Sequence, residues 1–262
     1  MVGGRLGRYV LEQALGHGAM GTVYRAVRDD GIVVALKVAA PELAADETYR
    51  RRFERESRIA ASLSHPHVVE VLEAGVADGR PFLASRLVKG RTLAQRIESD
   101  GPLEDAEAVR IVSEVASALD VLHERELVHR DVKPANVILE EGGGALLADF
   151  GLARGASDTV FTQTGRVSGT VDYLAPEVIR GAHAAPAADV YALGCVAYAC
   201  LSGGPPFGAR PVPDAILAHL EADPEPLASP LSEAVLQALA KSPDDRPPTA
   251  TAYALMLRVS LR

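Results

Sequence analysis

The chain has 262 residues, of which 48% are hydrophobic, and a formal net charge of −8. A chain of this size can bury a substantial core in one or two domains. Its acidic balance argues against a nucleic-acid partner, which usually requires a basic face. The only cysteines, Cys195 and Cys200, fit neither a disulfide framework nor a zinc site, so we expect buried thiols in a reducing compartment.

Short segments rich in apolar and β-branched residues dominate the first third of the chain. Strands are predicted at residues 9–15, 21–28, 32–39, 68–74 and 81–87. One amphipathic and highly charged helix is predicted at residues 48–63. We therefore expect a small, strand-rich N-lobe over about residues 1–87.

Helical periodicity replaces this pattern further along the chain. Helices are predicted at residues 104–125, 187–201, 232–240 and 249–259. The apolar run at 187–201 contains Asp189 and is too short to span a bilayer, so we expect a buried core helix and no membrane contact by this segment.

Together the elements predict one α+β domain over residues 1–262, with two lobes. A hinge at about residues 86–90 would join the N-lobe to a larger, mainly helical C-lobe over about residues 91–262. A cleft between two lobes is a natural ligand site. We expect a cytoplasmic location, either alone or as the cytosolic domain of a membrane-anchored protein.

Residues 16–23 (GHGAMGTV) follow the pattern G-x-G-x-x-G-x-V. This pattern alone is weak, because it also occurs in flexible hairpins and in dinucleotide-binding folds, where it joins a strand to a helix. Here it joins two predicted strands. That context favours a loop folded over phosphates, in which Gly16, Gly18 and Gly21 let backbone N–H groups approach the anion.

A lysine ends the next predicted strand, in the string VALK at residues 34–37. Such a lysine is often just an exposed edge residue, but Lys37 would here provide a positive charge for the α- and β-phosphates. An acidic residue on the predicted helix at 48–63 would orient it. We choose Glu56 for this role and keep Glu54, which lies on a different helix face, as the alternative.

The strongest signal is the string HRDVKPAN at residues 129–136. Asp131 would accept the proton of an attacking hydroxyl, Lys133 would neutralise charge on the transferred phosphoryl group, and Asn136 would hold a metal ion. Asp149, in the triplet DFG at 149–151, would provide a second ligand. Mg²⁺ prefers such oxygen donors together with phosphates.

In this order, the motifs resemble those of the protein kinase family. The string GTVDYLAPE at residues 169–177 completes the set, so the resemblance spans residues 16–246. Lys133 and Thr170 are similar to the Ser/Thr branch of the family. Three further strings resemble its eukaryotic-like bacterial members: HPHVV (65–69), GRTL (90–93) and PPF (205–207).

The resemblance implies a non-specific Ser/Thr protein kinase that transfers the γ-phosphoryl group of Mg-ATP to protein hydroxyls, with Mn²⁺ as a substitute for Mg²⁺. The implied catalytic residues are Asp131, Lys133, Lys37, Glu56 and Thr170. The implied ATP contacts are Leu15, Gly16, Gly18, Gly21, Val23, Ala35, Lys37, Ser85, Arg86, Val88 and Ile138. Asn136 and Asp149 would be the metal ligands, with Glu177–Arg246 and Asp189 as supporting scaffold.

Two features bear on regulation and nucleotide selectivity. Ser85 occupies the gatekeeper position and is smaller than the usual Met, Leu or Thr, while Arg86 replaces the usual hinge acid.

The string FTQT at residues 161–164 resembles an autophosphorylated activation loop. A phosphate on Thr162 or Thr164 could pair with Arg130, although a plain solvated loop is the simpler interpretation. Autophosphorylation between two copies would suit a homodimer.

Three alternatives compete with an active protein kinase. A pseudokinase usually lacks the lysine, the catalytic aspartate or the DFG aspartate, but Lys37, Asp131 and Asp149 are all present. A small-molecule phosphotransferase usually lacks the segment at 169–177. A pure interaction module would have no need for this ordered set of phosphate-handling motifs. We therefore expect a catalytically competent enzyme.

Overall fold

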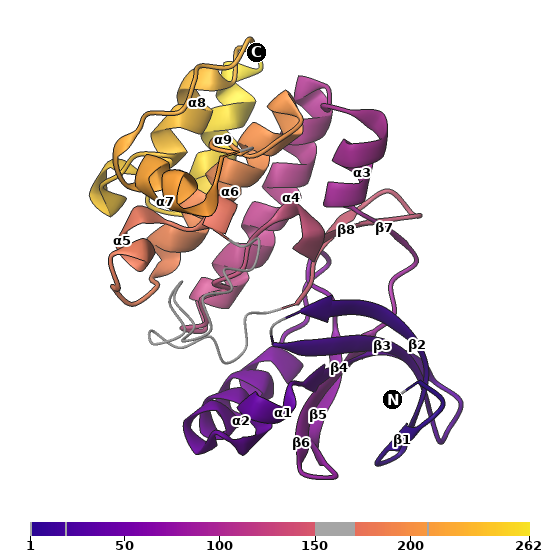
Figure 1. The fold of residues 1–262 in the computed structure, drawn as a ribbon. Coiled ribbons are helices and arrows are strands. Elements are labelled where there is room, and N and C mark those ends of the chain that lie inside the picture. The colour runs from indigo at the N-terminus through magenta and orange to yellow at the C-terminus, as the bar shows by residue number, and fades with distance from the viewer. Residues whose placement is uncertain (1, 19, 150–170, 209) are drawn as a thin grey trace. The chain divides into compact units, whose positions relative to one another are not determined.

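The structure is a computed structural model that describes residues 2–18, 20–149, 171–208 and 210–262 (Figure 1). The chain forms two compact units, Met1–Lys89 and Gly90–Arg262. The boundary between them falls among the residues predicted to form the hinge.

An antiparallel sheet of six strands, in the order β1-β2-β3-β4-β6-β5, forms most of the first unit. Its strands are β1 (Arg5–Leu6), β2 (Tyr9–Gly18), β3 (Gly21–Arg28), β4 (Val33–Ala39), β5 (Val71–Ala77) and β6 (Arg80–Arg86). The edge strands β1 and β5 lie close to each other. The backbone N–H of Gly7, after β1, donates to the carboxylate of Asp78, after β5, at 3.3 Å. The side chains of Arg8 and Tyr9 both donate to Glu73 on β5.

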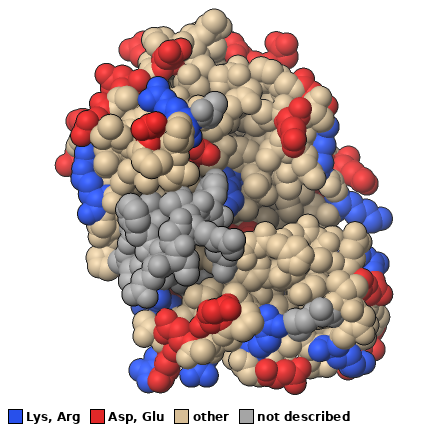
Figure 2. Space-filling view, viewed as in Figure 1, with Lys and Arg blue, Asp and Glu red and all other residues tan. Residues whose placement is uncertain are grey.

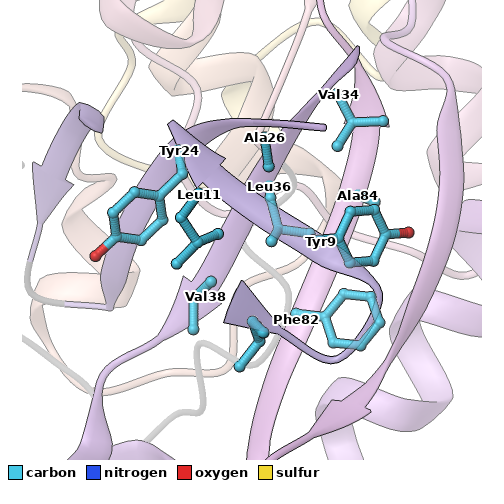
Figure 3. Close-up of a cluster of buried hydrophobic side chains, with 10 residues drawn as sticks. Tyr9, Leu11, Tyr24, Ala26, Val34, Leu36, Val38, Phe82 and Ala84 are labelled. Carbon is cyan, nitrogen blue, oxygen red and sulfur yellow. The ribbon is translucent and has the colours of Figure 1, made fainter. Parts of the chain in front are cut away.

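The sheet buries a cluster of alternating apolar residues on one face (Figure 3). Successive side chains of a strand point to opposite faces of the sheet. On β4, Val34, Leu36 and Val38 are therefore fully buried in the core, while Ala35 and Lys37 point to the other face. Tyr9 and Phe82 meet edge to face with ring centroids 5.4 Å apart. The core thus occupies one side of the sheet and leaves the other available for function.

Two helices follow β4, namely α1 (Pro41–Ala45) and α2 (Glu47–Ala61). Asp46 caps α2 by accepting from the backbone N–H groups of Thr48 and Tyr49 at 2.8 and 3.2 Å. The buried residues Tyr49, Phe53, Glu56, Ser57 and Ala60 recur at helical spacing along one face. This face packs against β5 and β6.

The second unit contains a small sheet, β7-β8-β9, and seven α-helices within the described residues. The strands are β7 (Gly90–Thr92), β8 (Val137–Glu140) and β9 (Ala145–Leu147). The helices are α3 (Leu93–Asp100), α4 (Asp105–His123), α5 (Pro176–Ile179), α6 (Pro186–Ser202), α7 (Val212–Glu221), α8 (Ser232–Ala238) and α9 (Ala250–Ser260). Short 3₁₀ turns occur at Pro134–Asn136, Val171–Tyr173 and Pro243–Asp245.

Helix α6 forms the centre of the second unit. Its residues from Ala188 to Cys200 are all buried, and it packs against α4, α8 and α9. A helix that is apolar on every side belongs in a core, which confirms the sequence-based expectation. Among the described residues, none of the helices combines the length and hydropathy that a bilayer span requires.

Candidate active site

The side chains predicted to carry the chemistry converge after α4. Lys133 Nζ lies 2.9 Å from Asp131 Oδ2, so the ammonium group neutralises the carboxylate directly. Asn136 Nδ2 donates to the backbone carbonyl of Asp131 at 2.7 Å and to Asp131 Oδ2 at 3.0 Å. Asp131 is therefore held by two neighbours that the motif supplies, and only 10% of its side chain is exposed.

Asp189, buried on α6, holds the backbone of this loop in place. Its Oδ2 accepts from the N–H of His129 at 2.8 Å, and its Oδ1 accepts from the N–H of Arg130 at 2.9 Å. Arg130 has a φ of 64°, an unfavourable value for a residue with a side chain. Charged acceptors make strong hydrogen bonds, so the two bonds help to stabilise this conformation. The expected tie between Asp189 and the loop is confirmed.

His129 links the catalytic loop to the segment that carries Asp149. The N–H of Asp131 donates to His129 Nδ1 at 3.3 Å, which places the ring proton on Nε2, 3.2 Å from the carbonyl oxygen of Ala148. Burial lowers the pKa of His129 and keeps the ring neutral. The N–H of Ala148 donates to the carbonyl of Asn136 at 2.8 Å. Both ends of the Ala148 residue are thus fixed beside the loop.

Asp149 follows Ala148 directly and has a φ of 60°. Such strained backbone in residues other than glycine is concentrated at functional sites. The amide group of Asn136 uses Nδ2 to reach Asp131, which leaves its Oδ1 as the atom that could bind a metal ion. An amide oxygen and a carboxylate are donors of the kind that Mg²⁺ takes alongside phosphate oxygens. The residues present therefore fit the expected metal ion.

The glycine-rich segment forms a hairpin between β2 and β3, with Gly18 paired to Gly21. Both flanking elements are strands, which is the context expected for a phosphate loop and not for a dinucleotide fingerprint. Packing explains why residue 21 is a glycine, because a Cβ there would lie 2.0 Å from the carbonyl oxygen of Val38. At Gly16 a Cβ would meet no described atom within 4 Å. Packing does not explain that glycine, which is consistent with a role in admitting a ligand.

Several predicted nucleotide contacts share the face of the first sheet that lies opposite the core. Cross-strand partners point to the same face, and the register pairs Val23 with Lys37 and Ala35 with Ser85. Ala35 and Lys37 are two residues apart on β4, so all four side chains lie on one face. Leu15 is 46% exposed near the end of β2. Arg86 ends β6 and Val88 follows it, both half-buried.

The structure separates the two acidic candidates on α2. Glu56 lies on the buried face of the helix with Phe53 and Ala60. Glu54 instead faces solvent and pairs with Arg58 at 3.1 Å, with both side chains about three-quarters exposed. A group that orients a lysine must be inside the protein, so the burial pattern favours Glu56.

Of the other predicted site residues, only Ile138 lies in the part of the chain that the structure describes. Ile138 lies on β8, paired with Thr92 and Leu146. Thr162, Thr164 and Thr170 lie outside the described residues.

A buried ion pair anchors the segment after residue 170. Arg246 donates from Nη1 and Nη2 to the two carboxylate oxygens of Glu177 at 2.8 and 2.7 Å. The same guanidinium donates to the carbonyls of Ala187, Ala240 and Lys241. The pairing expected from the motifs is confirmed, and it connects α5 to the segments at the start of α6 and after α8.

Comparison with known proteins decides the family. Residues 9–252 match the protein kinase domain. The chain belongs to the protein kinase family. The kinase fold predicted from the motif order is thereby confirmed.

Bacterial relatives support the finer resemblance. The chain is 40% identical over 255 residues to the serine/threonine-protein kinase PknD of Mycobacterium tuberculosis, covering 94% of this chain and 38% of that protein. It is 38% identical to PknH of Mycobacterium bovis, covering 99% of this chain and 45% of the relative. The kinase domain thus spans less than half the length of these relatives. The solved kinase domain of M. tuberculosis PknI superposes with a TM-score of 0.78 at 35% identity, with 99% of both chains covered.

Sequence reasoning missed two supporting histidines of this kinase domain. His123, at the end of α4, lies with Nε2 2.8 Å from Asp189 Oδ2, and His129 makes the two contacts described above. His129 belongs to the HRD string, so its position was visible, but its role follows only from the fold. For His123 we find no signal in the sequence.

Proposed function

We propose that this chain is a Ser/Thr protein kinase that transfers the γ-phosphoryl group of Mg-ATP to hydroxyl groups of proteins. The observation that carries the proposal is the convergence of Lys133 and Asn136 on Asp131 at 2.9 to 3.0 Å. Phosphoryl transfer depends mainly on positioning and charge neutralisation, and this arrangement provides both. The names of the relatives support the Ser/Thr branch.

In the proposed reaction, Asp131 accepts the proton of the substrate hydroxyl as its oxygen attacks the γ-phosphorus. The bond between that phosphorus and the β–γ bridging oxygen breaks, and ADP leaves. Lys133 neutralises charge that develops on the transferred group. A bound metal ion, held by Asn136 and Asp149, would neutralise charge on the phosphates. Lys37 would hold the α- and β-phosphates and Glu56 would orient it.

The nucleotide would be bound by the glycine hairpin and by the sheet face that carries Val23, Ala35, Lys37 and Ser85. Such a face supplies an apolar surface for adenine with one cation toward the phosphates, which suits ATP. The backbone groups of Arg86 and Val88 would bind the adenine edge, and Thr170 would act near the acceptor hydroxyl. We place the enzyme in the cytoplasm, where its nucleotide is available.

Regulation would operate through the segment after Asp149. Phosphate on Thr162 or Thr164, added by a second copy of the chain, would pair with Arg130 and fix the active loop. Asp189 already holds the backbone N–H of Arg130, so less conformational entropy would be lost when the Arg130 side chain pairs with a phosphate.

The proposal is tested with radiolabelled ATP, Mg²⁺ and a generic protein substrate. Asp131→Asn should lower transfer by about 10²- to 10⁴-fold, the usual contribution of a general base, while ATP binding stays nearly normal. The exposed Asp214→Asn on α7 changes charge equally and should retain wild-type activity. Lys37→Met should also lose activity.

Two outcomes would contradict this function. Near-normal transfer by Asp131→Asn would remove the assigned base. Binding of nucleotide by the wild-type chain without any transfer to protein would indicate a pseudokinase. Mass spectrometry of the wild-type product maps the phosphates, and sites elsewhere than Thr162 and Thr164 would reject the proposed regulation.

A further inference from the structure

His123, in the last turn of α4, contributes a largely buried side chain that the proposed phosphoryl transfer does not use. Only 11% of this side chain is exposed, and a carboxylate faces each of its ring nitrogens. Nε2 lies 2.8 Å from Asp189 Oδ2 on α6, and Nδ1 lies 3.9 Å from Asp120 Oδ1 on α4 itself. The ring thus connects the end of α4 to the residue that holds the catalytic loop.

The Nε2 atom of His123 is the donor in the contact with Asp189. The Asp189 carboxylate accepts from the N–H of His129 at Oδ2 and from the N–H of Arg130 at Oδ1, so both of its oxygens act as acceptors. An imidazole nitrogen that contacts such an oxygen at 2.8 Å must carry the proton. Three N–H groups, one from a side chain and two from the backbone, therefore share this carboxylate.

Burial makes each donor to Asp189 important. Figure 2 shows acidic side chains at the surface of the second unit, where water can solvate them. The Asp189 side chain is only 2% exposed, so water cannot readily take the place of a lost donor. A buried charged group is costly to leave without a hydrogen-bond partner, so the carboxylate would shift to recover one. Such a shift would weaken its bond to the N–H of His129.

The loop that Asp189 holds is strained next to the proposed catalytic base. Arg130 has a φ of 64°, and a residue with a side chain keeps such a conformation only where its surroundings enforce it. Asp131 follows directly, so a change in the backbone of Arg130 moves the Asp131 carboxylate. A displacement of about 1 Å at a reacting group costs up to about 10²-fold in rate.

The ring of His123 is also confined on the side away from Asp189. Asp120 accepts from the N–H groups of Ala250 and Thr251 at 3.0 and 2.9 Å, at the start of α9. These bonds fix the Asp120 carboxylate, which faces Nδ1 of the ring. The ring therefore has a fixed neighbour on each side, and Nε2 stays directed at Asp189.

From this arrangement we propose that His123 is a positioning residue for the transfer reaction. Its Nε2–H fixes the carboxylate of Asp189, and Asp189 fixes the backbone of the loop that carries Asp131. His123 acts through these groups and is assigned no contact with substrate or nucleotide. Its effect on the transfer rate rests on the function proposed above, whereas its effect on the loop backbone does not.

Two amide substitutions isolate the contribution of the Nε2 donor. His123→Gln places an N–H near the position of Nε2, whereas the shorter side chain in His123→Asn does not reach Asp189. In the assay with radiolabelled ATP and a generic protein substrate, His123→Asn should lower kcat by about tenfold, because Asp131 is less well positioned. The KM for ATP should change by no more than about twofold, and His123→Gln should recover most of the lost kcat.

Hydrogen exchange without ATP measures the loop backbone directly. The N–H groups of His129 and Arg130 donate to Asp189, so they should exchange about tenfold faster in His123→Asn than in wild type. In His123→Gln they should exchange at nearly the wild-type rate. This measurement does not require phosphoryl transfer.

Ser113→Ala is the matched control for a general loss of stability. Ser113 is buried on α4, and its Oγ accepts from Arg258 Nε on α9 at 3.1 Å, in a contact that does not involve the loop. This substitution should lower the urea midpoint but leave kcat and the exchange of the two loop N–H groups unchanged.

Unchanged kcat and unchanged loop exchange in His123→Asn would overturn the proposal. It is also wrong if His123→Gln fails to recover either quantity, or if Ser113→Ala lowers kcat as much at an equal loss of stability, because His123 then contributes only general stability. A wild-type chain that transfers no phosphoryl group would refute the proposed function instead, and hydrogen exchange would still decide the role of His123.

Discussion

At the scale of single residues, Ser85 is our proposed gatekeeper, where a serine would be smaller than the residue usual in the family. Ser85 pairs with Ala35 across β4 and β6, and its hydroxyl donates to the Ala35 carbonyl at 3.3 Å. That bond uses the hydroxyl proton, while the oxygen can still accept a hydrogen bond, so an ordered water is the competing occupant of the space beside it. Serine is smaller than Met or Leu, so we expect Ser85, as the proposed gatekeeper, to leave space that those side chains would fill.

We expect an ATP-site inhibitor with a bulky apolar group on the adenine N6 to bind wild type better than Ser85→Met. A clash in a packed site costs about 1–3 kcal/mol, which corresponds to about 5- to 150-fold in affinity. Inhibition constants of the two proteins measure the difference, and Ser85→Ala, which adds no bulk, should behave like wild type. Equal inhibition of wild type and Ser85→Met would show that the space is closed or that Ser85 is not the gatekeeper.

The residues of the site were predictable from the sequence to different degrees. Asp131, Lys133 and Asn136 lie within six residues of one another, so their convergence needs only a tight local turn. Glu56 could be distinguished from Glu54 only once burial was known. The contact between Asp189 and His123 joins residues on two helices, and no local pattern encodes the packing that brings them together.

At the scale of elements, the long periodic helices agree with the prediction to within a few residues, but several short ones were missed. Helix α7 begins at Val212 with prolines on either side, and no helix was predicted between residues 201 and 232. Proline is tolerated in the first turn, where no intrahelical donor is needed. Helix α3 has only eight residues, too few for a clear period, although Thr92 and Gln95 form a capping box that signals its start.

The ion pair between Glu177 on α5 and Arg246, after the 3₁₀ turn at Pro243–Asp245, should contribute to the stability of the second unit. The Arg246 side chain is fully buried and contacts Glu177 through two parallel hydrogen bonds. Lysine keeps the charge but lacks the planar fork, so Arg246→Lys leaves buried acceptors without donors. We expect a loss of about 1–3 kcal/mol in the free energy of unfolding, measured by urea denaturation, because this is the usual cost of buried groups left without a hydrogen-bond partner.

Arg58→Lys provides the comparison, because Arg58 forms an exposed pair with Glu54 on α2. That substitution should change the free energy of unfolding by no more than about 0.5 kcal/mol. Comparable effects of the two substitutions would mean that the buried pair contributes no more than a surface contact.

At the scale of the whole molecule, two buried histidines should make the kinase domain sensitive to acid. His219 is fully buried, with Nδ1 2.8 Å from the Tyr191 hydroxyl and its ring edge to face with Phe207. Burial, with a smaller contribution from the Lys241 ammonium, lowers the pKa of His219 to about 4. Burial also lowers the pKa of His129. Both rings belong to the Gly90–Arg262 unit, so their effects fall on the same core.

The sign of the effect follows from which state binds protons. A histidine in the unfolded chain has a pKa near 6.5, so above that pH neither state is protonated and His219 adds no pH dependence. As the pH falls from about 6.5 towards 4, the unfolded chain binds a proton that the folded core excludes, and stability declines. For His219 alone the loss should reach about 2 kcal/mol at pH 5.

We therefore expect His219→Gln to lose less stability than wild type between pH 7 and pH 5, by about 2 kcal/mol, although its stability at pH 7 is lower. Urea denaturation at the two pH values measures both quantities. His183→Gln is the control, because His183 is exposed and its removal should leave the wild-type pH dependence intact. Exposed carboxylates such as Asp100, whose pKa is lowered to about 2 by Arg91, titrate below this window and do not obscure it. An unchanged pH dependence in His219→Gln would show that the folded core accepts the proton on His219 as readily as water does.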